Sequence, residues 1–212
     1  MSMQDRVGAI CPHCGKMTQN KIWGTVNVGI NPELREEVLT GRVRRTTCPF
    51  CSSEFNVEWH FLYHDPKGKF MISYHPTKDG RSAPIPTVGL DLVEGVLSNY
   101  KLRLVTSWNE LREKIGIFES GLDDYPIETI KLLLGLGGDE VFYLCTRQNS
   151  DGVGELVFQV FRGREYLMDA WFPSDGYVRL AQEAEKKFGV GCNLGQWMIV
   201  NRATLEKWIL KA

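Results

Sequence analysis

The sequence has no long hydrophobic run and no excess of charge of one sign. No stretch of about 18 uncharged apolar residues occurs, so no segment is expected to cross a bilayer as a helix. Residues 1–6 turn polar at once and lack the apolar core of a signal peptide. The 25 Lys and Arg residues and 26 Asp and Glu residues give a net charge of -1. This balance disfavours binding to nucleic acid or membranes through a global field, and we expect a soluble cytoplasmic protein.

The sequence also lacks the common catalytic signatures. It contains no Walker A motif, no nucleophile elbow and no His-Glu-x-x-His motif. The glycine-rich segment 189–195 is expected to follow a helix and precede a strand, the reverse of the order that aims helix N–H groups at phosphate. With 43% hydrophobic residues and no repeat, the chain has ordinary globular composition. An enzyme is therefore not the first expectation, and we predict no catalytic residues.

The cysteines carry the strongest signal. Four of the six form two copies of one motif, Cys11-Pro12-His13-Cys14 and Cys48-Pro49-Phe50-Cys51, with 33 residues between them. A Cys-x-x-Cys turn aims both sulfurs at one point, and two such turns supply the four thiolates that structural zinc prefers. Gly15 after the first pair can take a positive φ, whereas Ser52 in the same place predicts a more strained turn. We predict one structural Zn²⁺ ion bound by Cys11, Cys14, Cys48 and Cys51.

Two other uses of the cysteines stay open. A thioredoxin-like redox pair normally occurs once, at the start of a helix, whereas here there are two copies and neither opens a helix. An iron–sulfur centre is the second alternative. We expect His13 to point outward and Cys145 to be buried and inert, and Cys192 on its glycine-rich loop is a candidate reactive thiol.

The segment between the two motifs predicts a strand and a short helix. Residues 22–30 alternate as a strand, and residues 31–41 predict a helix capped by Asn31 and ended by Gly41. Leu34 and Val38 share one face of that helix. Residues 42–47 lead back to the second motif.

Together these motifs resemble the CpXC domain family of bacteria and archaea. The resemblance rests on the paired Cys-Pro-x-Cys motifs, on segments 25–28 (TVNV) and 31–34 (NPEL) between them, and on 61–65 (FLYHD) after them. Residues 104–134 resemble the distal part of the same domain. The resemblance covers about residues 8–136 and implies a domain that bears a zinc ribbon. It implies no particular activity.

A second candidate site lies on the strands after the ribbon. Residues 55–63 alternate as a strand, and residues 70–74 form the returning strand, with Phe61 expected opposite Ile72 and Glu58 opposite His75. This register puts four metal-binding side chains on one face of the sheet: Glu58, His60, His64 and His75. The set could form a second metal site or a hydrolytic centre. We favour the simpler interpretation, a solvated sheet face without catalytic function.

The rest of the chain predicts alternating strands and helices. A strand at 101–106 leads into a capping box, Ser107 to Glu110, and two helices follow, the second with Ile127, Ile130, Leu133 and Leu134 inward. Three strands (141–148, 155–162, 165–172) form a β-meander, followed by a helix from Ser174, a short strand and a helix capped by Asn201. We predict an α+β fold with a four-cysteine zinc ribbon on a small antiparallel sheet with helices (8–136) and a second α+β domain (139–212).

The function predicted from these features is non-enzymatic. A metal staple, many aromatic residues and no catalytic set favour a zinc-binding module or accessory subunit that docks a protein partner. The first alternative is a ribbon that binds nucleic acid through Arg42, Arg44 and Arg45, although alternating arginines more often form a solvated face. The second alternative is a metal-dependent hydrolase built on the histidine face.

Overall fold

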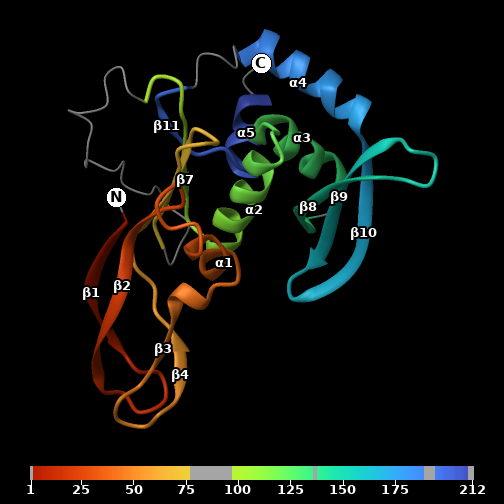
Figure 1. Cartoon of the computed structure of the whole chain (residues 1–212). Helices are drawn as coiled ribbons and strands as arrows, with labels where there is room; N and C mark the ends of the chain where they lie inside the picture. Colours follow the sequence, from red (N-terminus) through yellow and green to blue (C-terminus); the bar gives the residue numbers. More distant parts are fainter. Residues whose placement is uncertain (1, 77–96, 136–137, 189–193, 210–212) are drawn as a thin grey trace. The chain divides into compact units, whose positions relative to one another are not determined.

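The computed structural model describes residues 2–76, 97–135, 138–188 and 194–209. The fold is mixed α+β, and the chain forms two compact units, residues 1–94 with 102–112 and residues 95–101 with 113–212 (Figure 1). The predicted loop at 76–89 lies outside the described residues except for Pro76, and so do Cys192 and most of segment 189–195. No helix among the described residues is long and apolar enough to cross a membrane.

The first unit contains a mixed sheet. Its strands are adjacent in the order β1 (Met3–Ile10), β2 (Met17–Asn27), β5 (Phe61–Asp65), β6 (Phe70–Tyr74) and β7 (Lys101–Val105). β1 and β2 form a long antiparallel hairpin, and β5 and β6 form a second one. β2 and β5, however, run parallel, so the predicted purely antiparallel sheet is wrong at this junction. The chain between them carries the helix and the second cysteine motif, which makes the long connection that parallel strands need.

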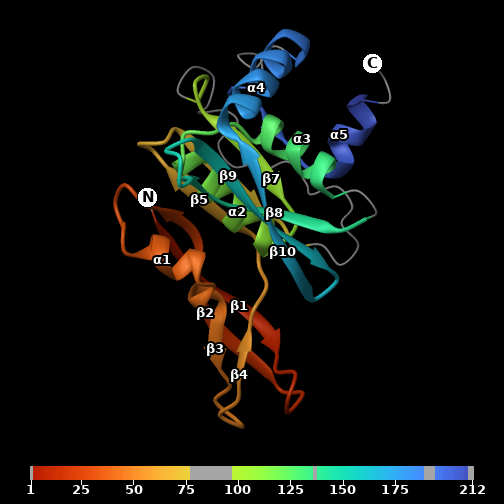
Figure 2. The same ribbon diagram turned by 90° about the vertical axis from the view of Figure 1, so that its right-hand side faces the viewer.

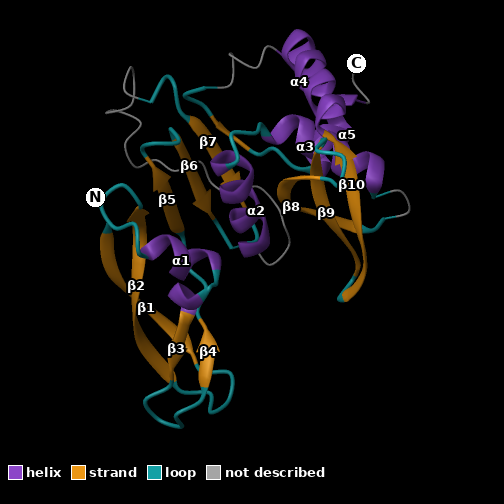
Figure 3. Cartoon of the chain, turned by 45° about the vertical axis from the view of Figure 1, so that its right-hand side comes forward, coloured by secondary structure: helices purple, strands orange, loops and turns teal. Residues whose placement is uncertain are grey.

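That connection forms a small layer beside the first hairpin. It contains α1 (Leu34–Leu39), the 3₁₀ turn η1 (Arg42–Arg44) and a two-stranded antiparallel sheet of β3 (Arg45–Thr47) and β4 (Glu54–Asn56) (Figure 3). Leu34 and Val38 are buried and Gly41 has φ +73°, as the helix prediction requires. The helix begins later than predicted, since its N-cap is Glu33 and not Asn31, and the Asn31 side chain donates to the Glu33 carboxylate, 2.9 Å away.

The predicted register of the second hairpin is wrong by two residues. Phe61 lies opposite Tyr74, and Tyr63 lies opposite Ile72. The Asp65 carboxylate accepts hydrogen bonds from the backbone N–H groups of Lys67 and Gly68, both at 2.9 Å, and this bonding gives a wider loop than expected. A shift of two keeps every side chain on its predicted face, so the apolar side remains buried. The expected strand 55–63 is also broken, because β4 ends at Asn56 and β5 begins at Phe61.

The predicted capping box is confirmed. α2 (Trp108–Glu119) begins after Ser107, whose hydroxyl oxygen accepts from the backbone N–H of Glu110 at 3.2 Å. The Glu110 carboxylate accepts in return from the Ser107 N–H at 3.1 Å. The next helix, α3 (Asp124–Leu134), is capped by Asp123. Its Ile127 and Ile130 are buried as predicted, but Leu133 is 54% exposed because it lies on the outer face of the last turn.

The second unit contains the predicted meander and its helices. β8 (Glu140–Gln148), β9 (Gly154–Arg162) and β10 (Glu165–Pro173) form an antiparallel sheet in the order β10-β9-β8. α3 packs against β8, and α4 (Ser174–Phe188) packs against α3, β9 and β10 (Figure 2). The short β11 (Trp197–Met198) and α5 (Arg202–Ile209) follow, and the Asn201 side chain caps α5 by accepting from the Thr204 N–H at 3.1 Å.

Charged side chains are buried in the second unit. The Lys114 ammonium lies 3.1 Å from a carboxylate oxygen of Asp124 and 2.9 Å from one of Glu128, and the three side chains are at most 2% exposed. Lys131 joins them through Glu128 and Glu113. Burial lowers the pKa of Lys114, but the carboxylates of Asp124, Glu128 and Glu113 outweigh it and raise that pKa above its usual value. The lysine therefore stays charged inside the fold.

The division into compact units falls inside α2, whose N-terminal part belongs to the first unit and whose remainder belongs to the second. The domains expected at 8–136 and 139–212 stay a prediction.

Candidate metal centre

The two cysteine motifs adopt the same local structure. In the first, which connects β1 to β2, the Cys11 N–H donates to the Lys16 carbonyl at 3.0 Å and the Gly15 N–H donates to the Cys11 carbonyl at 2.9 Å. In the second, the Cys48 N–H donates to the Ser53 carbonyl and the Ser52 N–H donates to the Cys48 carbonyl, both at 2.9 Å. Each turn thus holds its two cysteines at the end of a hairpin.

The predicted difference between the turns is also present. The fourth residue after the start of each turn is left-handed, with φ +71° at Gly15 and φ +59° at Ser52. Glycine adopts this conformation freely, whereas another residue pays roughly 1 kcal/mol or more for it. The second turn is therefore the strained one.

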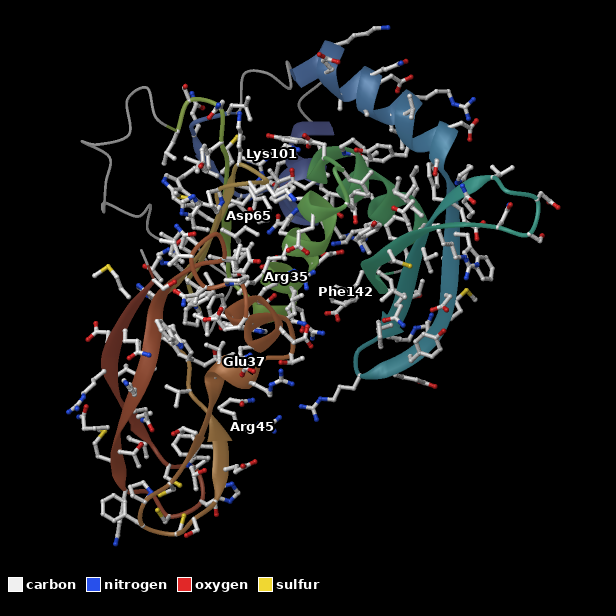
Figure 4. The ribbon with its side chains drawn as sticks, in the orientation of Figure 1. Arg35, Glu37, Arg45, Asp65, Lys101 and Phe142 are labelled. Atoms are coloured by element: carbon white, nitrogen blue, oxygen red, sulfur yellow. The ribbon has the colours of Figure 1, made fainter. Side chains whose placement is uncertain are left out.

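The two turns bring all four thiols together. The sulfur atoms of Cys11 and Cys51 lie 3.7 Å apart, and so do those of Cys14 and Cys48. All four lie within 4.8 Å of one another, at the end of the ribbon where Figure 4 shows the sulfur atoms. Four sulfurs about 2.3 Å from a central tetrahedral ion would lie roughly 3.8 Å apart. The cluster therefore has the dimensions of a site for one metal ion.

This geometry bears on the alternatives for the cysteines. The 3.7 Å contacts join cysteines of different motifs, whereas a redox pair uses the two cysteines of one motif. A separation of at most 4.8 Å also leaves room for one ion but not for a cluster of several irons and sulfides. Both observations favour a single ion over a thioredoxin-like pair or an iron–sulfur cluster.

The thiols differ in acidity. Hydrogen bonds from the hydroxyl and the backbone N–H of Ser53 contribute most to lowering the pKa of Cys51, which is about 6. The Lys16 backbone N–H lowers the pKa of Cys14, but burial and the neighbouring thiols outweigh it and raise that pKa to about 11. The hydrogen bonds from Ser53 thus favour ionisation of Cys51, whereas burial and the neighbouring thiols oppose ionisation of Cys14, and a bound cation would remove that opposition.

Little apolar surface holds the ribbon together near the cysteines. Instead, buried polar side chains connect the layers. The Thr18 hydroxyl donates to the Ala9 carbonyl at 2.9 Å, the Asn20 amide donates to the Thr18 hydroxyl at 2.9 Å, and the Thr46 hydroxyl donates to the Asn20 side-chain oxygen at 3.1 Å. This chain of bonds links β1, β2 and β3. Each such bond contributes only about 1 kcal/mol net, so the end of the ribbon needs another source of stability.

Exposed apolar side chains lie beside the cysteine turns at the tip of the ribbon. Ile10 and Met17 lie opposite each other in the first hairpin and are 63% and 58% exposed. Phe50 in the second turn is 56% exposed, and the Lys16 ammonium lies 4.8 Å from the centre of its ring. His13 is exposed as predicted. The tip is therefore apolar with a basic edge.

The predicted histidine face does not form a metal site. His60 and His75 have ring centres 4.6 Å apart, but His75 is only 5% exposed and its Nε2 lies 2.7 Å from the Ser73 hydroxyl. Burial lowers the pKa of His75, and the positive charge that His60 can carry lowers it further.

The other two members of that face have different partners. His64 contacts Asn27, with 3.1 Å between its Nδ1 and the Asn27 amide nitrogen. Glu58 lies outside any strand, pairs with Arg44 and accepts a hydrogen bond from the Tyr74 hydroxyl. Among the described residues, the four cysteines are the only group of three or more metal-binding side chains with ligand atoms close enough to share an ion. The hydrolase hypothesis therefore lacks its ligand set.

The three arginines of the nucleic-acid alternative do not lie together on one strand. Residues 42–44 form a 3₁₀ turn, and only Arg45 belongs to a strand. Arg42 pairs with Glu37 at 3.0 Å. The Arg44 side chain is 15% exposed, pairs with Glu58 and lies 4.8 Å from the Trp108 ring centre. These arginines therefore do not form one basic surface.

Sequence reasoning missed β1. The strand is mostly exposed, and its only signal is the alternation of the half-buried Val7 and Ala9 with polar residues and glycine. As a result it also missed Arg6, which lies directly opposite Lys21 on the outer face of the hairpin. Cys145, expected to be buried, is half-exposed on β8.

The chain was compared with known proteins. No curated protein and no solved structure is significantly similar to it. The model of the CpXC protein family matches residues 10–131, more than half of the sequence, in agreement with the expected resemblance over about 8–136. The matched segment contains both cysteine motifs and the two helices that follow β7. The chain therefore belongs to the CpXC protein family.

Proposed function

We propose that this protein is a non-enzymatic binding module in which one Zn²⁺ ion, held by Cys11, Cys14, Cys48 and Cys51, fixes the end of a ribbon that docks a protein partner. The observation that carries the proposal is the sulfur cluster, with its 3.7 Å contacts between two matching turns. Four thiolates without an open position suit a structural ion, which stabilises the fold and performs no chemistry.

The surroundings of the cluster support docking of a protein. Ile10, Met17 and Phe50 project from the same end of the ribbon and stay exposed, although each would normally be buried. Lys16 beside Phe50 adds a positive charge at the edge. The expected partner therefore offers an apolar surface with an acidic rim.

The metal is tested by elemental analysis of the purified full chain. We expect one zinc per chain and a loss of that zinc in Cys48→Ser. Iron in place of zinc, or no metal, would refute the proposed ion.

Docking is tested separately. Proteins captured from a native lysate by the full chain are compared with those captured by Phe50→Asp and Met17→Lys, with Ile30→Lys as the control because Ile30 is 59% exposed but lies outside the cysteine turns. A partner that uses the tip is lost in the first two variants and kept in the third, while all three variants keep their zinc. Equal capture by all three would exclude the tip as the docking surface.

A nucleic-acid-binding ribbon is the second candidate, supported by a different surface from the one expected. Arg6 and Lys21 lie opposite each other and are exposed, and like charges in this position destabilise a sheet unless an anion lies between them. If they bind phosphates, affinity for single-stranded RNA falls with added salt, and Arg6→Gln with Lys21→Gln lowers the slope by roughly 1.4. Arg42→Gln is the control, because Arg42 is already paired with Glu37.

A further inference from the structure

The three-stranded sheet of the second unit ends at an open edge. In the part of the chain that the structure describes, no strand pairs with the outer side of β10. Three large side chains of this strand are exposed: Tyr166 by 51%, Met168 by 58% and Trp171 by 55%. Lysine or proline commonly blocks pairing at such edges, and residues 165–172 contain neither. β10 therefore presents unpaired backbone groups flanked by apolar side chains.

We propose that β10 pairs with β10 of a second copy of this chain, antiparallel and around a two-fold axis at Ala170. The two three-stranded sheets then join into one continuous sheet. In this register Asp169 faces the second copy's Trp171, and Met168 faces the second copy's Phe172. Met168 and Trp171 lose much of their exposure to water, which supplies the favourable free energy.

The sequence of β10 selects this axis. The register of β10 against β9 shifts between Tyr166 and Met168, so the regular part of the strand begins at Met168. An axis at Asp169 would put two carboxylates directly opposite each other, which is destabilising. An axis at Trp171 would draw Pro173, which has no N–H group, into the hydrogen-bond ladder. Ala170 is the remaining centre, and its small side chain suits the close approach of two copies.

The self-complementary pattern also argues for a second copy over an unrelated strand. The segment 168–172 contains one charged residue, Asp169, and the two-fold axis at Ala170 keeps the two copies of that carboxylate apart. A pairing of this length is smaller than a standard interface of about 1,600 Å². We therefore expect a dissociation constant on the order of 1–100 µM.

The first test is sedimentation velocity of the full chain from about 1 to 300 µM, a range chosen to bracket that expected affinity. A dimer that forms with rising concentration is the expected result. A monomer throughout this range would overturn the proposal, and a strand of another protein would then be the alternative partner of β10.

The second test uses charge to identify the register. Trp171→Glu and Trp171→Lys remove the same largely exposed apolar side chain, and both lose its contact with Arg147, whose guanidinium lies 5.6 Å from the ring centre. Circular dichroism checks that both variants keep the fold. In the proposed register residue 171 faces the second copy's Asp169, so a glutamate there is repelled and a lysine is attracted. We therefore expect Trp171→Glu to raise the dissociation constant of the dimer at least about tenfold more than Trp171→Lys does. Adding Asp169→Lys to Trp171→Glu restores dimerisation.

The control is Leu144→Glu, because Leu144 is 52% exposed on β8, at the opposite edge of the same sheet. We expect this variant to dimerise like the wild type. Equal effects of the two Trp171 variants without rescue, or loss of the dimer in Leu144→Glu, would overturn the assignment of β10 as the interface.

Discussion

Different kinds of contact stabilise the cysteine end of the ribbon and the helices and sheet of the second unit. At the ribbon end, the contacts between layers are four clustered sulfurs, of which only those of Cys11 and Cys48 belong to buried residues, and a short chain of hydrogen bonds through Thr18, Asn20 and Thr46. In the second unit, side chains such as Phe158, Leu156 and Ile127 are fully buried, and charged side chains are buried with them. A thin two-layer ribbon cannot enclose enough apolar surface, and in the function proposed above a metal ion bound by the four cysteines takes the place of a hydrophobic core there.

The largest expected effect is that loss of the proposed zinc unfolds the ribbon and leaves the second unit folded. Structural zinc contributes apparent binding energies of about 10–16 kcal/mol in isolated fingers. We expect Cys48→Ala, or chelation of the wild type, to unfold residues 3–27 and 45–56, seen as loss of amide protection in hydrogen exchange. Amides of β9 should keep their protection, because that strand packs in the other core. Equal loss in both regions would show that the two are one cooperative unit.

The second prediction concerns the buried ion pairs of the second unit. Lys114→Met removes the buried cation that contacts Asp124 and Glu128 and leaves Lys131 as the cation beside Glu128, and removing one partner of a buried pair costs about 3–5 kcal/mol. Chemical denaturation of the zinc-loaded chain measures the change. Arg179→Met is the control, because the Arg179–Asp175 pair is about 70% exposed on both sides and should contribute almost nothing. A Lys114→Met variant as stable as the control would mean that the carboxylates take up protons at little cost.

The third prediction concerns pH. Burial lowers the pKa of His75, so the fold prefers its neutral form. This preference stabilises the fold above the ordinary histidine pKa of about 6.5 and is lost as the pH falls through the lowered value. We expect His75→Gln to reduce the loss of stability between about pH 7.5 and 5.

Acid also protonates the cysteines, so the pH profile of the wild type alone is ambiguous. The informative quantity is the difference between the wild-type and His75→Gln profiles, with zinc occupancy measured at each pH. Parallel profiles would show that His75 titrates alike in the folded and unfolded chains.

The smallest effect tests the strain in the second cysteine turn. Ser52 has φ +59°, and Ser52→Gly should stabilise the zinc-bound chain by about 1 kcal/mol because glycine adopts this conformation freely. Gly15→Ser should destabilise it by a similar amount, since it places a side chain in the same conformation in the first turn. Thermal unfolding of both variants measures the change in stability relative to the wild type. If both variants were more stable, or both less stable, the expected equivalence of the two turns would be contradicted.

Much of the local structure followed from short sequence signals. The capping box at Ser107, the cap at Asn201 and the three strands of the meander depend on residues that are neighbours in sequence, and each is present. The two cysteine turns were equally accessible, because each motif fixes its own turn. The family match over residues 10–131 agrees with the same motifs.

The pairing of strands and the partners of charged side chains depend on contacts between residues far apart in the sequence, and local patterns did not predict them. The parallel contact of β2 with β5 depends on how the chain returns after the second cysteine turn, and no local pattern encodes it. The expected placement of Glu58 on one sheet face with the histidines was wrong, because Glu58 lies in an irregular segment and pairs with Arg44, a partner 14 residues earlier in the sequence. The pairing of the arginines could not be predicted for the same reason, since a charged side chain near the surface takes whichever partner the fold brings to it. The sequence by itself therefore determined the two cysteine turns, the caps at Ser107 and Asn201 and the strands of the meander, whose geometry is local. Only the tertiary structure decided how the two cysteine turns meet, which charged side chains are paired and which strand edges stay open.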